Sequence, residues 1–149
     1  MSLTQKEADR LLRLEKRPSD AHVYKFPASG GKCQVPLISG LNKNKEIFTL
    51  DVYRGRTNII KIKYQTRARK IVPLARLDFG GSPHRNPNGE EITTHHLHIY
   101  REGYGAKWAY PLSPPDFSIN ATSQQLLTEF LQFCNIVNFS FSQGTLDHL

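Results

Sequence analysis

Four of the six histidines of this chain lie between residues 84 and 98, which makes that segment the first place to look for chemistry. Histidine exchanges a proton near neutral pH, and it is also the commonest metal ligand. The side chains of an extended strand alternate between two faces, so His96 and His98 are expected to point the same way. His84, from the preceding loop rich in glycine and proline, is expected to close on them.

Three imidazoles beside arginine suit the acid–base cleavage of a phosphodiester bond. One neutral imidazole removes the proton of the ribose 2′-hydroxyl, and a second protonates the leaving oxygen. Arginines balance the charge that gathers on phosphorus, so this reaction requires no metal ion or other cofactor. The catalytic residues that this hypothesis predicts, beside Asp78, are His84, His96, His98, Arg76 and Arg85.

Two other interpretations of the histidines remain open. His96 and His98 could bind a metal ion together with His84 or Glu102, since imidazole and carboxylate are ordinary ligands. The spacing approaches the first cupin motif, but the gap after its glycine is one residue longer and no second motif follows. The other interpretation is structural: the imidazoles only satisfy backbone hydrogen bonds, as is expected for His95.

Basic residues are concentrated in the middle of the chain. The formal net charge is +7 and the pI is near 9.6, a balance that favours RNA or another polyanion as partner. Between Tyr53 and Leu77 there are eight basic residues and no acidic residue. A strand that continues beyond Tyr64 would place four of them on one face, namely Lys61, Lys63, Arg67 and Arg69. Phosphate groups would be attracted to such a stripe, although a solvated face that discourages edge pairing is the alternative.

The predicted nucleic-acid interface combines this charge with aromatic rings that are expected to be exposed and to stack on bases. Its predicted members are Arg54, Arg56, Lys61, Lys63, Arg67, Arg69, Tyr100 and Trp108. Tyr64 and Tyr104 are further aromatic candidates for the same role.

A helix is predicted at each end of the chain. Thr4 and Glu7 have capping-box spacing before a narrow apolar stripe, which predicts a helix over residues 4–17. Thr122 and Gln125 repeat this spacing before a strongly amphipathic stretch, which predicts the second helix.

Strands are predicted between the helices from alternating and apolar runs, at residues 34–39, 46–53, 58–64, 71–79, 95–101 and 107–112. Residues 17–32 and 84–88 are expected to be loops. Proline cannot donate a hydrogen bond to a neighbouring strand, so Pro73 predicts an edge position or a bulge.

These elements predict an α+β fold, in which an N-terminal and a C-terminal helix flank an antiparallel sheet of five to six strands. One sheet face is expected to be covered by the helices and the other to be free. The length of 149 residues predicts a single domain over 1–149. Cys33 and Cys134 have no disulfide or zinc-ligand spacing, and no apolar leader or membrane-spanning run is present, so a cytoplasmic protein is expected.

Residues 53–58, 77–90 and 96–109 resemble an uncharacterised family of small bacterial and prophage proteins, and the resemblance extends more weakly over most of the chain. A looser likeness is to TumE-type toxins, in which an Arg-x-Asp strand precedes a Pro-His turn and a His-x-His strand. The residues that match here are Arg76, Asp78, Pro83, His84, His96 and His98. Such toxins are similar to RelE and barnase-like ribonucleases, which implies an RNA-directed nuclease with an acidic antitoxin protein as partner. The chain departs from them in a longer N-terminal hairpin and in Gly80 and Gly81 before the turn.

The leading prediction is therefore a small RNA-binding protein that acts as a metal-independent, toxin-type endoribonuclease. The main alternative is a non-enzymatic binder, such as a phage-encoded inhibitor, that uses a cationic sheet face. A histidine-based metal protein is the third. The sequence leaves the oligomeric state open.

Overall fold

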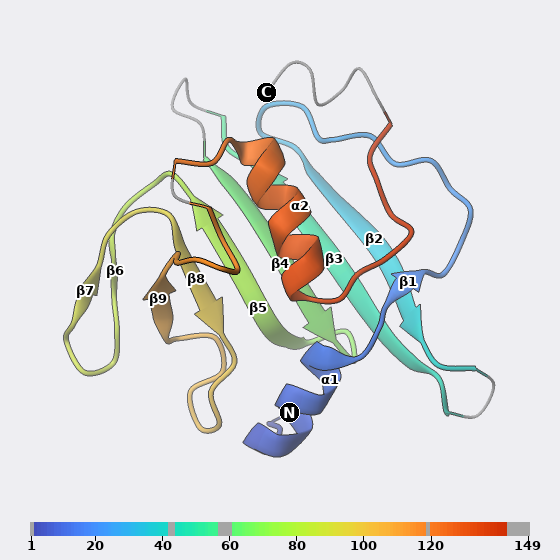
Figure 1. The fold of residues 1–149 in the computed structure, drawn as a ribbon, viewed down its shortest axis with the longest axis horizontal. Coiled ribbons are helices and arrows are strands. Elements are labelled where there is room, and N and C mark those ends of the chain that lie inside the picture. Colours follow the sequence, from blue (N-terminus) through green and yellow to red (C-terminus); the bar gives the residue numbers. More distant parts are fainter. Residues whose placement is uncertain (1, 42–43, 57–60, 119, 143–149) are drawn as a thin grey trace.

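The computed structural model describes residues 2–41, 44–56, 61–118 and 120–142, and it has the predicted α+β architecture (Figure 1). The two helices are α1 (Gln5–Arg13) and α2 (Ser123–Phe133). The strands are β1 (Arg17–Pro18), β2 (Lys32–Ser39), β3 (Glu46–Arg54), β4 (Ile62–Ala68), β5 (Val72–Phe79), β6 (His84–Arg85), β7 (Glu91–Ile92), β8 (His96–Ile99) and β9 (Ala109–Pro111).

Seven strands form one antiparallel sheet in the order β1-β2-β3-β4-β5-β8-β9. The sheet exceeds the predicted five to six strands because β1, within the stretch expected to be a loop, pairs with Leu37 and Ile38 of β2. A second correction concerns residues 84–88. The segment begins with β6, which pairs with β7 in a separate two-stranded hairpin.

Helix α2 lies across one face of the sheet, in front of β3 and β4 in Figure 1. Tyr64 of β4 packs against Phe130 with ring centroids 6.0 Å apart, and its hydroxyl donates to the carbonyl of Ser123 at 3.0 Å. The capping box of Thr122 and Gln125 is present in full at the start of α2, as predicted. Among the helices of the described residues, none has the length and apolar content to cross a membrane.

Helix α1 is shorter than predicted. It ends at Arg13 rather than near residue 17, and only half of its capping box forms. Thr4 accepts a hydrogen bond from the backbone of Glu7, but the Glu7 carboxylate is bonded to Arg10 instead of turning back to the cap.

Strand β4 alternates strictly between buried and half-exposed residues, which confirms the alternation predicted from its sequence. The strand runs beyond Tyr64 to Ala68, whereas residues 57–60, where it was expected to begin, lie outside the described residues. A register shift between Thr66 and Arg67 lies where Arg67 pairs with Pro73. The predicted bulge is thus confirmed. Strand β5 as a whole is not an edge strand because it lies between β4 and β8, but its ladder with β8 covers only residues 75–78 and does not reach Pro73.

Candidate functional site

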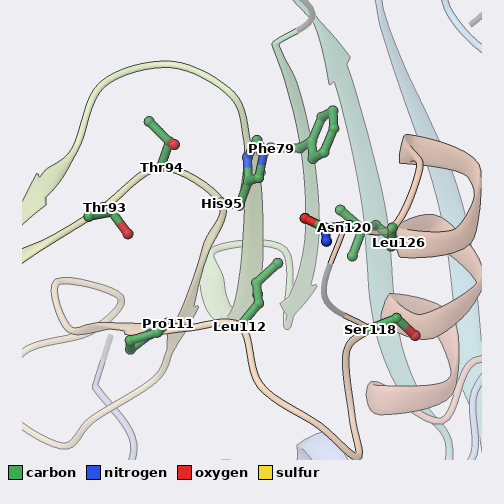
Figure 2. A pocket seen from close by; sticks show the side chains of 10 residues that line it. Phe79, Thr93, Thr94, His95, Pro111, Leu112, Ser118, Asn120 and Leu126 are labelled. Atoms are coloured by element: carbon green, nitrogen blue, oxygen red, sulfur yellow. The ribbon is translucent and has the colours of Figure 1, made fainter.

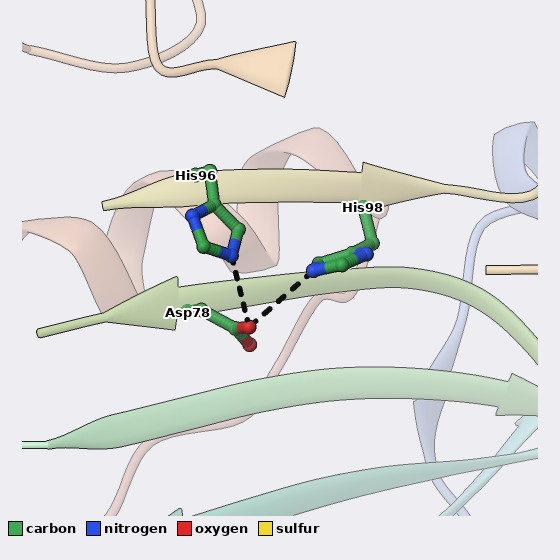
Figure 3. A group of neighbouring side chains, drawn as sticks. All are labelled: Asp78, His96 and His98. Carbon is green, nitrogen blue, oxygen red and sulfur yellow. Dashed lines mark hydrogen bonds and ion pairs between the residues drawn. The ribbon is translucent and has the colours of Figure 1, made fainter. Parts of the chain in front are cut away.

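Two neighbouring strands bring together the charged and imidazole side chains of the site (Figure 3). In the pairing of β5 with β8, Asp78 lies opposite His96 and Arg76 lies opposite His98. Leu97, between the two histidines, is buried in the apolar core on the α2 side. The histidines therefore lie on the sheet face away from α2, as their alternation predicted.

His84 reaches the same place from β6. Its ring centroid is 4.6 Å from that of His98 and 5.8 Å from that of His96, and the last two rings are 5.0 Å apart. The structure thus brings together the three imidazoles that were expected to converge.

The cluster is covered, which corrects the expectation of a free sheet face. His96 is 2% exposed and His98 is 1% exposed, whereas His84 is half-buried. The β6–β7 hairpin is fixed over them by Asn86, whose side chain bonds both the carbonyl and the amide of Ala109 at 3.0 and 2.8 Å. Of the three imidazoles, only that of His84 is partly accessible.

The surroundings of His96 favour its charged form. Its Nδ1 lies 2.9 Å from the carbonyl of Thr93, and its Nε2 lies 3.2 Å from a carboxylate oxygen of Asp78. Both partners only accept hydrogen bonds, so the arrangement is satisfied when both ring nitrogens carry a proton. Burial alone would lower the pKa of His96, but these bonds outweigh it and raise the pKa above the ordinary histidine value.

The surroundings of His98 favour its neutral form. Its Nδ1 lies 2.7 Å from the carbonyl of Ala106, so Nδ1 carries the proton. Its Nε2 lies 3.0 Å from the guanidinium of Arg76, which can only donate, so Nε2 accepts. Burial lowers the pKa of His98 below the ordinary value, despite a carboxylate oxygen of Asp78 at 3.4 Å.

His84 differs from both in having one ring nitrogen without a partner. Its Nε2 donates to the carbonyl of Lys107 at 2.8 Å. Its Nδ1 has no hydrogen-bond partner in the parts of the chain that the structure describes, so in the neutral ring this nitrogen offers a lone pair.

Asp78 is the anion at the centre of the cluster. Both of its oxygens accept from Arg76, at 2.9 and 3.2 Å. Burial would raise the pKa of Asp78, but the hydrogen bond from His96 and the charge and hydrogen bonds of Arg76 hold it far below the usual range. The carboxylate is therefore ionised beside the guanidinium of Arg76 and the ring of His96.

Arg85 does not join the predicted catalytic set. Its guanidinium bonds the carbonyl of Gly89 at 3.1 Å and the carboxylate of Glu91 at 3.4 Å, and its side chain is 69% exposed. The reason is alternation within β6, which sends His84 toward β8 and the next side chain away from it.

Within the described ranges, one group of residues could hold a metal ion: Asp78, His96 and His98, whose ligand atoms lie within 4.8 Å of one another. The guanidinium of Arg76 opposes a cation there, because it lies 3.0 Å from one ligand nitrogen and bonds both carboxylate oxygens. The cupin-like arrangement is wrong in one respect: the Glu102 carboxylate accepts from the backbone of Gln5 in α1 instead of joining the histidines.

His95 has the structural role that was expected. Its Nδ1 accepts from the amide of Gly80 at 2.9 Å, and its ring stacks on Phe79 with centroids 4.3 Å apart. This pair lines a pocket of about 460 Å³ between β8 and the start of α2, together with residues that include Leu112 and Leu126 (Figure 2). The residues that the sequence analysis assigned to catalysis are not among those that line the pocket.

The basic stripe is partly neutralised. Arg67 forms a bidentate pair with Asp51, at 2.5 and 2.9 Å. Arg69 leaves the strand in a turn with φ of +50° and bonds Glu7 and Glu46, each at 3.2 Å. These arginines therefore form ion pairs with carboxylates that lie outside residues 53–77. A count of charges within that segment does not include those carboxylates.

The remaining predicted basic residues lie near one another at one end of the sheet. Arg54 ends β3 and bonds Gly31 through its amide, and exposed Arg56 lies against Gly30. Two lysines line a cleft of about 160 Å³ that the sequence analysis missed, with Asp78 in its wall; the lining residues are Lys61, Ile62, Lys63, Asp78, Gly80, Gly81 and Ser82. The Gly-Gly-Ser sequence directly after β5 was its only local signal.

Two of the aromatic predictions are wrong. Tyr100 is 5% exposed, and its hydroxyl bonds both the amide and the carbonyl of Leu3 at 2.7 Å. Tyr64 is fully buried under α2. Trp108 is half-buried with the guanidinium of Arg101 4.2 Å from its ring, and Tyr104 is 43% exposed.

The fold and the site define a small basic α+β protein with a buried cluster of one carboxylate, one guanidinium and three imidazoles on a sheet face. The chain belongs to the DUF6978 family, a family of unknown function whose model matches residues 3–136. Neither the curated proteins nor the solved structures contain a significant match to the chain. The resemblance to an uncharacterised family is thus confirmed, and no named relative supports the looser likeness to toxins.

Proposed function

We propose that the protein cleaves RNA without a metal ion, using the imidazoles of the cluster as acid and base. The observation that carries this proposal is the close packing of His96 and His98, whose rings are 5.0 Å apart, between hydrogen-bond partners that shift their pKa values in opposite directions. Neighbouring groups whose surroundings push their pKa values apart are a mark of acid–base sites.

The outermost imidazole takes the role of base. The lone pair on Nδ1 of His84 removes the proton of a ribose 2′-hydroxyl, while the Lys107 carbonyl fixes the ring through Nε2. The 2′-oxygen attacks phosphorus and the bond to the 5′-oxygen breaks.

The inner residues supply the proton and the positive charge. The imidazolium of His96 protonates the departing 5′-oxygen, and the guanidinium of Arg76 offsets the charge on the phosphoryl oxygens. His98 positions that guanidinium by accepting a hydrogen bond from it. Because His96 is 2% exposed, the phosphodiester enters between His84 and His96 only when the β6–β7 hairpin moves outward.

The test is incubation of the purified protein with RNA in EDTA between pH 5 and 8. Cleavage is expected, and His84→Ala should lower the rate about 10²- to 10⁴-fold, as loss of a general base does. Arg85→Gln is the matched control on the same strand and should cleave normally. RNA that stays intact across this pH range would rule the proposal out.

A second candidate function is favoured by the burial of His96 and His98, 2% and 1% exposed. In this case the protein only binds a polyanion or an acidic protein, such as an antitoxin, through its lysines. His84→Ala would then leave binding unchanged, whereas Lys61→Glu combined with Lys63→Glu would abolish it. Measuring both cleavage and binding on the same variants separates the two functions.

A further inference from the structure

Tyr53 and the two lysines beside it lie on the sheet face that carries the histidine cluster. The strand registers place Lys32 opposite Tyr53, and Tyr53 opposite Lys63. The same row continues through Asp78 to His96. Five neighbouring strands thus contribute one residue each to a single row on the face away from α2, and we call its first three residues the Lys–Tyr–Lys row.

The Lys–Tyr–Lys row is accessible. Tyr53 is 39% exposed, Lys32 is exposed and Lys63 is half-exposed. Across the described ranges, the acidic groups make no ion pair with Lys32, Lys61 or Lys63, in contrast to Arg67 and Arg69. An exposed aromatic ring between unneutralised cations is the arrangement with which proteins bind single-stranded nucleic acid.

The small cleft continues this row toward the histidines. Lys61 and Lys63 line it together with Asp78, which bonds His96. Its volume of about 160 Å³ admits a phosphate group but not a duplex. Neighbouring strands are about 4.8 Å apart, so Tyr53 lies about 14 Å from His96 along the row, a distance that a short extended oligonucleotide spans.

We propose that the Lys–Tyr–Lys row is a track for single-stranded RNA. One base stacks on Tyr53, the adjoining phosphate lies between Lys61 and Lys63, and the following phosphodiester reaches His84. The proposal rests on the proposed function, since it states how the substrate of that site is held. A duplex does not fit the track because its bases are already stacked on one another.

The test uses a fluorescent 2′-O-methyl oligonucleotide, which has no free 2′-hydroxyl and so cannot be cleaved by this route. Fluorescence anisotropy measures its binding to the wild type and to variants. Tyr53→Leu should weaken binding about 5- to 100-fold, as the loss of one base stack does, and Tyr53→Trp should preserve it. Lys63→Gln should lower the slope of log Kd against the logarithm of the salt concentration by the amount that about one phosphate contact contributes.

Tyr110→Leu is the matched control. Tyr110 is 38% exposed, close to the 39% of Tyr53, but it pairs with Leu97 and therefore lies on the opposite sheet face. This variant should bind the oligonucleotide as the wild type does.

The proposal of a single-strand track is contradicted if the wild type does not bind the single-stranded oligonucleotide or binds a duplex of the same sequence equally well. It is also overturned if Tyr53→Leu binds like the wild type or if Tyr110→Leu loses as much affinity as Tyr53→Leu. Binding that depends on Tyr53, without cleavage of ordinary RNA, would instead contradict the proposed function and leave the track intact.

Discussion

At the scale of single residues, the site depends on which atom carries each proton. His96 and His98 have the same ordinary pKa, are two residues apart and face the same carboxylate. Asp78 and a carbonyl accept from His96, whereas Arg76 donates to His98. The donors and acceptors around two identical rings therefore favour the charged form of one and the neutral form of the other.

The two histidines should titrate in opposite directions from the ordinary value near 6.5. His96 should keep its proton to higher pH, and His98 should lose its proton at lower pH, when ring carbon–proton shifts are followed by NMR. Arg76→Leu should raise the pKa of His98, because a nearby positive charge is removed. Superimposable titration curves for His96 and His98 would contradict this assignment.

The same shifts fix the sign of the pH dependence of stability. The raised pKa of His96 stabilises the fold below about pH 6.5, and this contribution is lost as pH rises through the folded-state pKa. The lowered pKa of His98 has the opposite effect. The fold loses stability as the pH falls below the ordinary histidine pKa, because the unfolded chain then takes up a proton at His98 more readily than the folded protein does. Urea unfolding at pH 8 and pH 5.5 gives the free energy of unfolding of each variant relative to wild type. Between these two pH values, this difference should therefore change in opposite directions for His96→Gln and His98→Gln.

At the scale of elements, the β6–β7 hairpin decides whether the cluster is buried. The two strands of this hairpin are two residues each and are held to β9 through the amide of Asn86, which is 4% exposed. A single two-stranded hairpin as short as this one is stable only where it docks. Movement of this element is what the proposed cleavage requires.

Asn86→Ala should release the hairpin. The change leaves the amide and carbonyl of Ala109 without their partners, which costs about 1–3 kcal/mol. Faster hydrogen exchange is expected at the amide of Ala109, together with easier modification of His96 and His98 by diethyl pyrocarbonate. Asn88→Ala on the exposed turn is the control, and equal exchange in both variants would show that Asn86 does not fix the hairpin.

At the scale of the whole molecule, Lys16 joins the two ends of the described chain. The side chain is fully buried, and its ammonium donates to the carbonyls of Leu12, Leu14 and Cys134 at 2.7–2.8 Å. Burial lowers its pKa to about 8. Backbone bonds from Lys16 to Asn135 and from Val137 to Lys16 complete the junction between the segments that follow α1 and α2.

Lys16→Met should destabilise the protein although it places an apolar side chain in an apolar site. Three buried carbonyls lose their donor, which we expect to lower the free energy of unfolding by about 2–4 kcal/mol in urea titrations at pH 7. Lys6→Met, at an exposed position of α1, is the control and should change it by less than about 0.5 kcal/mol. A Lys16→Met variant as stable as wild type would mean that the cost of burying the charge equals the gain from its bonds.

Local patterns in the sequence determined both helices, the longer strands and the faces of the site, but not the two-residue strands β1, β6 and β7. The alternation of residues 58–64 and 96–98 predicts which side chains share a face, because alternation is a property of one extended backbone. The capping box of Thr122 and Gln125 likewise needs only four consecutive residues. These local rules were sufficient for the α+β class and for the convergence of His96 with His98.

Only the tertiary structure decided what surrounds those faces. The pairing of Arg67 with Asp51, the burial of Tyr100 against Leu3 and the covering of the histidines all join residues far apart in the chain. Such contacts depend on strand register and on where loops dock, and no spacing within a single segment specifies either. The sequence by itself thus determined which imidazoles share a face, whereas folding determined their protonation, their burial and the row of lysines and tyrosine beside them.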